Sequence, residues 1–117
     1  MSWDVEFDDE FETEFDQFTD PVKTELLARA RVLAQFGPAL GRPNVDPLSG
    51  SEYKNMKELR FNADDGVWRI AFVFDPDRKA ILLCGGDKRG KDQKRFYGNL
   101  IKVADRRFKL RLDRCEK

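Results

Sequence analysis

Histidine is absent from this 117-residue chain, and cysteine occurs only twice, at Cys84 and Cys115. Without histidine, neither a Ser-His nor a Cys-His nucleophile pair can form, so proton transfer near neutral pH must come from Lys, Tyr, Arg or a carboxylate. The two cysteines do not have the CxxC spacing of a zinc site, and zinc sites of the usual Cys/His kind are therefore not expected. We predict that the protein uses no metal and no cofactor.

The chain also lacks a signal peptide, a long apolar span and any low-complexity tract. These absences predict a cytoplasmic protein with free thiols and no membrane association. With 40% hydrophobic residues, a chain of this length matches one small domain that buries about two-thirds of its unfolded surface. We therefore expect a single domain, residues 1–117, that folds alone.

Basic residues are missing from the first twenty positions, which hold nine acids. The whole chain has 22 Lys plus Arg and 22 Asp plus Glu, so the remaining residues carry 22 bases against 13 acids (22 − 9), a net charge of +9. Such segregation is typical of proteins that bind nucleic acid or another polyanion. We interpret the acidic segment itself as a solvated helix surface, against which the basic remainder can lie.

The first third of the chain predicts a short strand followed by two helices. Apolar and acidic residues alternate from Trp3 to Phe7, as in a half-buried strand. One helical face is then marked by phenylalanines spaced four or three apart, at Phe7, Phe11, Phe15 and Phe18. A second helix is predicted to begin at Thr19 or Asp20 with Pro21 in its first turn, and to end near Phe36. The following segment, Pro38 to Ser51, is rich in proline and glycine and is interpreted as a loop.

Period-two alternation from Lys54 onward predicts three consecutive antiparallel strands. If Leu59 and Phe61 share a buried face with Trp68 and Ile70, Arg60 must lie beside Arg69 on the opposite face. The same reasoning pairs Phe72 with Ile81 and Ile70 with Leu83, and places Cys84 near Arg69. One face should be core and the other should carry arginines. The predicted class is α+β, with a small antiparallel or mixed sheet of about four strands, an N-terminal helical hairpin and a C-terminal helix.

Arg69 is the only charge in the apolar run Val67 to Phe74. A charge in mid-strand requires a partner or a function, because burying it alone is costly. Two interpretations stay open, namely a salt bridge to Glu58 or to an acid of the first helix, and the binding of a ligand. Arg60 places a second guanidinium on the same face, where planar donors can hold a phosphate.

The stretch Ala80 to Tyr97 predicts a buried strand that ends at Gly85 and Gly86 and continues into a cationic loop. Two adjacent glycines permit a sharp turn or the close approach of a ligand. The basic residues that follow are Lys88, Arg89, Lys91, Lys94 and Arg95, which we interpret as phosphate contacts or solubilising charge. A C-terminal helix is predicted from Lys91 or Asp92. Tyr97 begins its apolar stripe, where it is either a core residue with its hydroxyl at the rim or a functional group.

Three blocks of sequence resemble the RelE/ParE superfamily of bacterial toxin–antitoxin toxins, in particular its HigB-like, phage-derived branch. They are MKELRF at Met56 to Phe61, VWRIAFVFDPDRKAILLCGGDKRG at Val67 to Gly90, and FYGNLIKVADRRF at Phe96 to Phe108. The resemblance covers essentially the whole chain. It implies a compact RelE-like, microbial-ribonuclease-like fold with the order β-α-α-β-β-β-α.

The resemblance further implies ribosome-dependent cleavage of mRNA, and hence a block of translation, without a metal. Lys, Arg and Tyr would promote attack of the ribose 2′-hydroxyl on the adjacent phosphate. Arg69 would stabilise the charged phosphorane and Lys88 or Arg89 would lie near the scissile phosphate. Arg60 with Lys57 would bind phosphate, and Tyr97 would act as a base or stack on a base. Further RNA-binding residues would be Lys54, Lys91, Lys94 and Arg95.

The implied partners are an antitoxin, expected to be of the helix-turn-helix type, and the ribosome with its message. Two alternatives remain in the same fold. One is the ParE-like branch of the superfamily, which inhibits gyrase and lacks the catalytic cations. The other is a relic of the fold that binds RNA or protein without catalysis. The presence of Arg60, Arg69 and Lys88 favours the ribonuclease.

Overall fold

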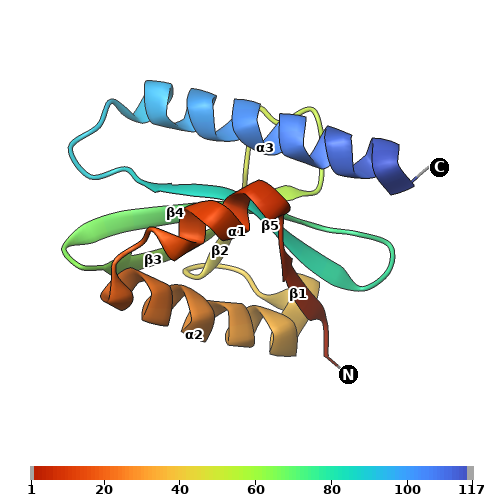
Figure 1. The fold of residues 1–117 in the computed structure, drawn as a ribbon, viewed down its shortest axis with the longest axis horizontal. Helices are drawn as coiled ribbons and strands as arrows, with labels where there is room; N and C mark the ends of the chain where they lie inside the picture. The colour runs from red at the N-terminus through yellow and green to blue at the C-terminus, as the bar shows by residue number, and fades with distance from the viewer. Residues whose placement is uncertain (1, 116–117) are drawn as a thin grey trace.

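Helices cover both faces of a five-stranded sheet in the computed structural model of this protein, which describes residues 2–115 (Figure 1). Met1, Glu116 and Lys117, which the predicted single domain includes, lie outside the described residues. The elements follow in the order β1 (Asp4–Phe7), α1 (Asp9–Asp16), α2 (Asp20–Phe36), a 3-10 turn η1 (Gly37–Ala39), β2 (Val45–Pro47), β3 (Met56–Ala63), β4 (Gly66–Phe74), β5 (Lys79–Asp87) and α3 (Gln93–Cys115). The predicted α+β class is confirmed.

The sheet is mixed, and its strands lie in the order β1-β5-β4-β3-β2. β1 runs parallel to β5, whereas all the other neighbouring strands are antiparallel. The predicted succession of elements is confirmed except for β2, a strand of three residues inside the segment that was predicted as a loop. So short a strand shows no period-two pattern, and its Pro47 is tolerated because β2 lies at the edge of the sheet.

One face of the sheet is covered by α1 and α2, whose apolar stripes form a core with it. Phe11 is fully buried there, as the phenylalanine spacing predicts. The partly buried phenylalanines of the same segment are Phe7, Phe15 and Phe18. α2 follows Thr19, has Pro21 in its first turn and ends at Gly37, where φ is 57°. A Cβ at Gly37 would also collide with the Trp3 ring, so glycine is required on two counts.

The opposite face is buried as well, because α3 lies across it (Figure 1). The prediction of one core face and one arginine-bearing face is therefore wrong for most of the sheet. β4 is buried on both faces over residues 70–73, which follows from its nearly continuous apolar sequence. The side chains that α3 packs there are Phe96, Leu100, Ala104 and Phe108. Arg69 lies at the end of this face, beside the first turns of α3.

The register of β3 and β4 is as predicted, with Leu59 opposite Ile70 and Arg60 opposite Arg69. The predicted register of β4 and β5 is wrong. Ile70 lies opposite Gly85, and a register shift falls between Ala71 and Phe72. A bulge of this kind reverses the facing of every residue beyond it, which alternation alone cannot reveal. Cys84 consequently lies opposite Ala71 and not beside Arg69.

Gly85 and Gly86 do not end β5, which continues to Asp87. A Cβ at Gly85 would collide with Cδ1 of Ile70 and lie 3.3 Å from the Arg69 carbonyl oxygen. A Cβ at Gly86 would lie 3.1 Å from the Phe96 ring. Gly85 is therefore required for close packing within the sheet, and a Cβ at Gly86 would press on the Phe96 ring of α3. The predicted end of the strand at these two residues is therefore wrong, and the sharp turn, one of the two interpretations of the glycine pair, begins only after Asp87.

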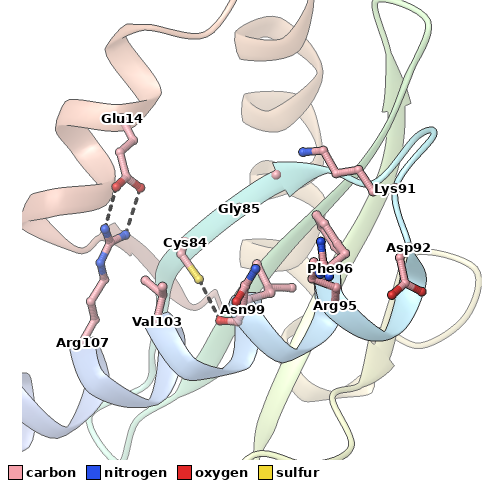
Figure 2. A pocket seen from close by; sticks show the side chains of 12 residues that line it. Glu14, Cys84, Gly85, Lys91, Asp92, Arg95, Phe96, Asn99, Val103 and Arg107 are labelled. Atoms are coloured by element: carbon pink, nitrogen blue, oxygen red, sulfur yellow. Dashed lines mark hydrogen bonds and ion pairs between the residues drawn. The ribbon is translucent and has the colours of Figure 1, made fainter.

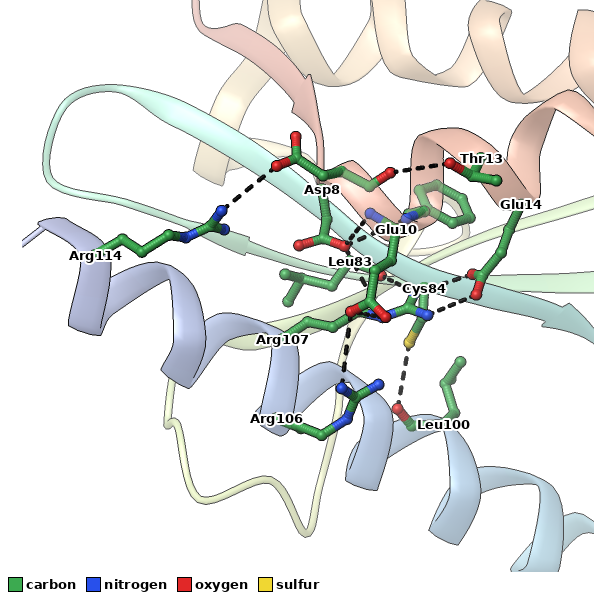
Figure 3. A network of polar contacts seen from close by, with 12 residues as sticks. Asp8, Glu10, Thr13, Glu14, Leu83, Cys84, Leu100, Arg106, Arg107 and Arg114 are labelled. Atoms are coloured by element: carbon green, nitrogen blue, oxygen red, sulfur yellow. Dashed lines mark hydrogen bonds and ion pairs between the residues drawn. The ribbon is translucent and has the colours of Figure 1, made fainter.

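The acidic first segment lies against α3 and pairs with its arginines (Figure 3). Arg107 is the centre of this contact, with a side chain 6% exposed. Its Nη2 atom lies 2.6 Å from Oε2 of Glu14, and its Nη1 donates to the Leu83 carbonyl oxygen at 2.8 Å. Asp8 is buried, lies 3.9 Å from Nε of Arg107, and accepts from the backbone N–H of Glu10 at the start of α1. The interpretation of this surface as simply solvated is thus incomplete.

Within the described residues, no helix is long and apolar enough to cross a membrane.

Candidate functional site

A carboxylate, a guanidinium and a phenol meet where β3, β4 and α3 come together. The Tyr97 hydroxyl donates to Oε1 of Glu58 at 2.7 Å, and Nε of Arg69 donates to the Tyr97 oxygen at 3.2 Å. The same Nε lies 3.6 Å from Oε1 of Glu58. The side chains of Arg69 and Glu58 are each 7% exposed, so their charges interact with little screening by solvent. We call these three residues the tyrosine cluster.

The salt bridge between Arg69 and Glu58, one of the two interpretations of the mid-strand arginine, is present. Nη1 of Arg69 in addition donates to the Trp68 carbonyl oxygen at 2.9 Å. These contacts fix the guanidinium, and Arg69 also lines a cleft of about 370 Å³ whose lining does not include Glu58.

Burial raises the pKa of the Tyr97 hydroxyl. The hydrogen bond to Glu58 raises this pKa further, whereas Arg69 acts in the opposite direction. Near neutral pH the phenol therefore stays protonated and donates to Glu58. The phenolic proton of Tyr97 has an acceptor, Oε1 of Glu58, 2.7 Å away. It can pass to that oxygen if the phenolic oxygen accepts a proton from another molecule. The Tyr97 hydroxyl thus links Arg69 to Glu58 through two hydrogen bonds.

Two other predicted site residues lie beside the tyrosine cluster. Arg60 is directly opposite Arg69 in the β3–β4 register, and its side chain is 32% exposed. Lys88 follows β5, and its Nζ lies 5.8 Å from the centroid of the Tyr97 ring. The backbone N–H of Lys88 donates to the Val67 carbonyl oxygen at 2.8 Å, which fixes the start of the loop. The structure therefore brings together Arg60, Arg69, Lys88 and Tyr97.

The remaining basic residues of the loop and of the start of α3 spread away from this cluster. The guanidinium of Arg89 donates to the Asp65 carbonyl oxygen, which fastens the loop to the β3–β4 turn. Lys91 and Arg95 line a separate pocket of about 660 Å³ between α1, β5 and α3 (Figure 2). Lys94 is exposed in the first turn of α3. These cations form a basic rim and do not belong to the tyrosine cluster.

Two predicted RNA-binding lysines are not brought to the site. The side chain of Lys57 packs over Phe74, with Nζ 5.7 Å from the ring centroid. Because alternate residues of a strand point to opposite faces, Lys57 cannot share a face with Glu58 or Arg60. Lys54 is exposed just before β3 begins, at the end of that strand far from Arg60.

Glu58 was predicted only as a partner for Arg69, and its bond to Tyr97 was not predicted. The bond depends on where α3 crosses the sheet, which no local pattern encodes. Arg29 of α2, which lines the same cleft as Arg69, was also missed. The helical period could have drawn attention to it, because Arg29 lies beside the apolar stripe of α2 whereas Arg31 lies on the exposed side. No group of three or more His, Cys, Asp or Glu side chains among residues 2–115 could hold a metal ion.

The fold is that of a bacterial toxin of known structure. A mutant of the Escherichia coli toxin RelE in the free state superposes with a TM-score of 0.61, over 87% of this chain and 96% of that chain. The two sequences are 12% identical, so the likeness concerns the fold. It agrees with the RelE-like fold that the sequence blocks imply.

The chain belongs to the family of phage-derived Gp49-like proteins, whose sequence pattern matches residues 13–109. It is similar to two curated proteins of Mycobacterium tuberculosis that are named as toxins. It is 54% identical to HigB3 over 76 residues, which are 65% of this chain and 64% of that protein. It is 45% identical to HigB2 over 92 residues, 78% of this chain and 45% of that protein. The matches thus span less than two-thirds of each relative. The HigB-like, phage-derived branch predicted from the sequence is confirmed.

Proposed function

We propose that this protein is the toxin of a type II toxin–antitoxin pair and acts as a metal-independent endoribonuclease on mRNA at the ribosome. The tyrosine cluster carries this proposal, because it combines a buried proton acceptor, a phenol and a guanidinium within hydrogen-bond reach. The membership of the Gp49-like family and the similarity to proteins named HigB support the toxin role. Such an activity operates in the cytoplasm, where translated messages are found.

In the proposed reaction, the 2′-oxygen of a ribose attacks the adjacent phosphorus while the bond from phosphorus to the 5′-oxygen breaks. The products are a 2′,3′-cyclic phosphate and a 5′-hydroxyl end. The 2′-hydroxyl proton passes to the Tyr97 oxygen as the Tyr97 proton moves to Glu58. Arg69 and Arg60 stabilise the charge that develops on the phosphorane oxygens. Lys88 gives a proton to the leaving 5′-oxygen.

The test is primer extension on a translated reporter message after induction of the protein. New 5′ ends are expected within the translated region, together with arrest of growth. Arg69→Lys keeps a cation beside Glu58 but lacks the planar fork of donors, so it should fold like the parent and cleave at least about a hundredfold more slowly. Arg31→Lys, an exposed change on α2, is the matched control and should cleave like the parent.

The other functions of this fold have distinct outcomes in the same experiment. Arrest with intact messages and a supercoiling defect would identify a gyrase inhibitor instead. Folded protein that causes no arrest would identify a binding relic without catalysis. A gene for a small helix-turn-helix protein beside the gene for this chain would supply the proposed antitoxin.

A further inference from the structure

A second cationic site lies at the outer edge of β3. The short strand β2 pairs only with residues 57–59 of β3, so the edge from Arg60 onward has no strand beside it. There the chain preceding β2 turns away, held by a bond from the Arg60 backbone N–H to the Asn44 carbonyl oxygen at 2.8 Å. The cleft of about 370 Å³ opens at this edge, within the size range of small-ligand pockets.

The lining of this cleft is cationic and rich in hydrogen-bond donors. Three arginines reach it from three different elements: Arg29 of α2, Arg60 of β3 and Arg69 of β4. The side-chain amides of Asn44 and Asn62 complete its polar lining, and no carboxylate belongs to it. An anion in this cavity therefore lies next to three arginines, whose guanidiniums are planar hydrogen-bond donors.

The acids that pair with these arginines lie outside the cleft. Arg29 binds Glu25, one turn away on α2, at 2.8 Å. Arg69 binds Glu58 in the tyrosine cluster. Nη1 of Arg60 lies 4.0 Å from Asp46. Asp46 is also bound by Arg42, at 2.9 Å. These acids hold the arginines in place, and none of them lines the cleft itself.

Arg29 is held in a fixed orientation toward the cleft. Its Nη1 donates to Oδ1 of Asn44 at 2.8 Å, while its Nε donates to Glu25. Because the Asn44 amide accepts with its oxygen, both of its N–H donors are left for another acceptor. A ligand in the cleft therefore meets planar guanidinium and amide donors. Phosphate, whose oxygens only accept, satisfies such an arrangement.

We propose that this cleft binds the RNA phosphate next to the one that reacts, with Arg29 and Asn44 as positioning residues. The inference rests on the proposed function, because Arg69 lines the cleft and also belongs to the tyrosine cluster. A phosphate held by Arg29 and Arg60 places the neighbouring phosphodiester beside Arg69. The two sites together fix the position of the RNA strand. The 2′-oxygen and the phosphorus are then held close to the geometry that attack requires.

The test measures binding separately from cleavage. A single-stranded oligoribonucleotide of five residues with 2′-O-methyl groups cannot be cleaved, and its affinity is measured by fluorescence anisotropy at several salt concentrations. Arg29→Gln is expected to weaken binding about tenfold and to reduce the salt slope by about 0.7, the loss of one phosphate contact. Arg31→Gln, on the exposed face of the same helix, is expected to change neither quantity. In NMR spectra of the parent, inorganic phosphate should shift the side-chain amides of Asn44 and Asn62 saturably.

Equal affinity and equal salt slope in the two variants would overturn the proposal, as would a phosphate titration that leaves both asparagine amides unmoved. An acidic peptide with the same charge as the oligonucleotide is the competing ligand. If it binds to the parent as tightly, the cleft recognises carboxylates and the proposal is wrong. The outcomes also separate the two proposals of function. If Arg29→Gln loses binding but the parent does not cleave RNA, only the proposed ribonuclease activity is refuted. If Arg29→Gln binds and cleaves like the parent, only the proposed role of the cleft is refuted.

Discussion

At the scale of single residues, the tyrosine cluster explains how a chain without histidine can move a proton. A tyrosine is a weak base near pH 7, and the raised pKa of Tyr97 makes direct ionisation still harder. In the proposed reaction the Glu58 carboxylate, 2.7 Å away, removes this obstacle because it accepts the phenolic proton as the substrate proton arrives. Glu58 is therefore as important to the proposed chemistry as Tyr97.

The Glu58→Gln variant tests this relay. The amide keeps the size of the carboxylate but is not a proton acceptor, so the cleavage rate should fall by about a hundredfold or more. The remaining route requires ionised Tyr97, and the burial of the hydroxyl, which raises its pKa, still opposes this ionisation in the variant. The residual rate should thus rise steadily with pH between about 7 and 9, where the rate of the parent stays nearly constant.

Single-turnover cleavage measured across this pH range decides between the two behaviours. Glu52→Gln, an exposed change in the segment that precedes β3, is the control and should keep both the rate and the pH profile of the parent. A Glu58→Gln protein that cleaves like the parent would show that Glu58 is only the salt-bridge partner of Arg69.

At the scale of secondary-structure elements, a glycine of β5 allows close packing against β4, the strand that carries Arg69. Gly85 lies directly opposite Ile70, and its missing Cβ leaves space for the fully buried Ile70 side chain. The strand that carries Arg69 can therefore pack tightly against β5.

Gly85→Ala is expected to destabilise the fold by about 1–3 kcal/mol, because the new methyl group overpacks a full core. In the Ile70→Val background the colliding Cδ1 atom is gone, and the cost of Gly85→Ala should be clearly smaller. Urea unfolding of the four proteins of this cycle measures the difference. Gly98→Ala on α3, where a Cβ meets nothing within 4 Å, should leave stability unchanged or raise it. Equal costs of Gly85→Ala in both backgrounds would contradict the packing argument.

The elements also show what the sequence could predict. Arg60 and Arg69 were correctly paired because the β3–β4 hairpin has a short turn and regular alternation, so burial of the apolar residues dictates the register. The bulge at Ala71 and Phe72 breaks that rule without a local signal. The proximity of Tyr97 to Glu58, and of Arg29 to Arg60, depends on how α3 and α2 pack on the sheet. Such contacts between distant segments are set by tertiary packing and not by periodicity.

At the scale of the whole molecule, the segregated charge of the sequence is used twice. The acids of the first segment neutralise arginines in the second half of α3. Under the proposed function, the cations near the start of α3 and along β3 and β4 bind RNA, and the charge asymmetry noted in the sequence is divided between stabilising the fold and binding an anion.

Arg107→Met should destabilise the protein by about 3 kcal/mol, because the buried Asp8 carboxylate loses its cation. Arg106→Met is the matched neighbour, with a side chain 54% exposed and one partner at 3.8 Å, and should cost less than about 1 kcal/mol. Denaturant unfolding at low ionic strength compares them. Similar losses in the two variants would show that the contact is an ordinary surface pair.

The parallel pairing of β1 with β5 has a consequence for the order of events during synthesis. Asp4 leaves the ribosome early, yet its partner Lys79 follows 75 positions later (79 minus 4), and Tyr97 later still. The pairing of β1 with β5 cannot form before Lys79 has emerged, nor the tyrosine cluster before Tyr97, because such non-local contacts form late. Under the proposed function, a nascent copy is therefore inert until Tyr97 joins the sheet, which leaves an interval in which an antitoxin made beforehand can capture it.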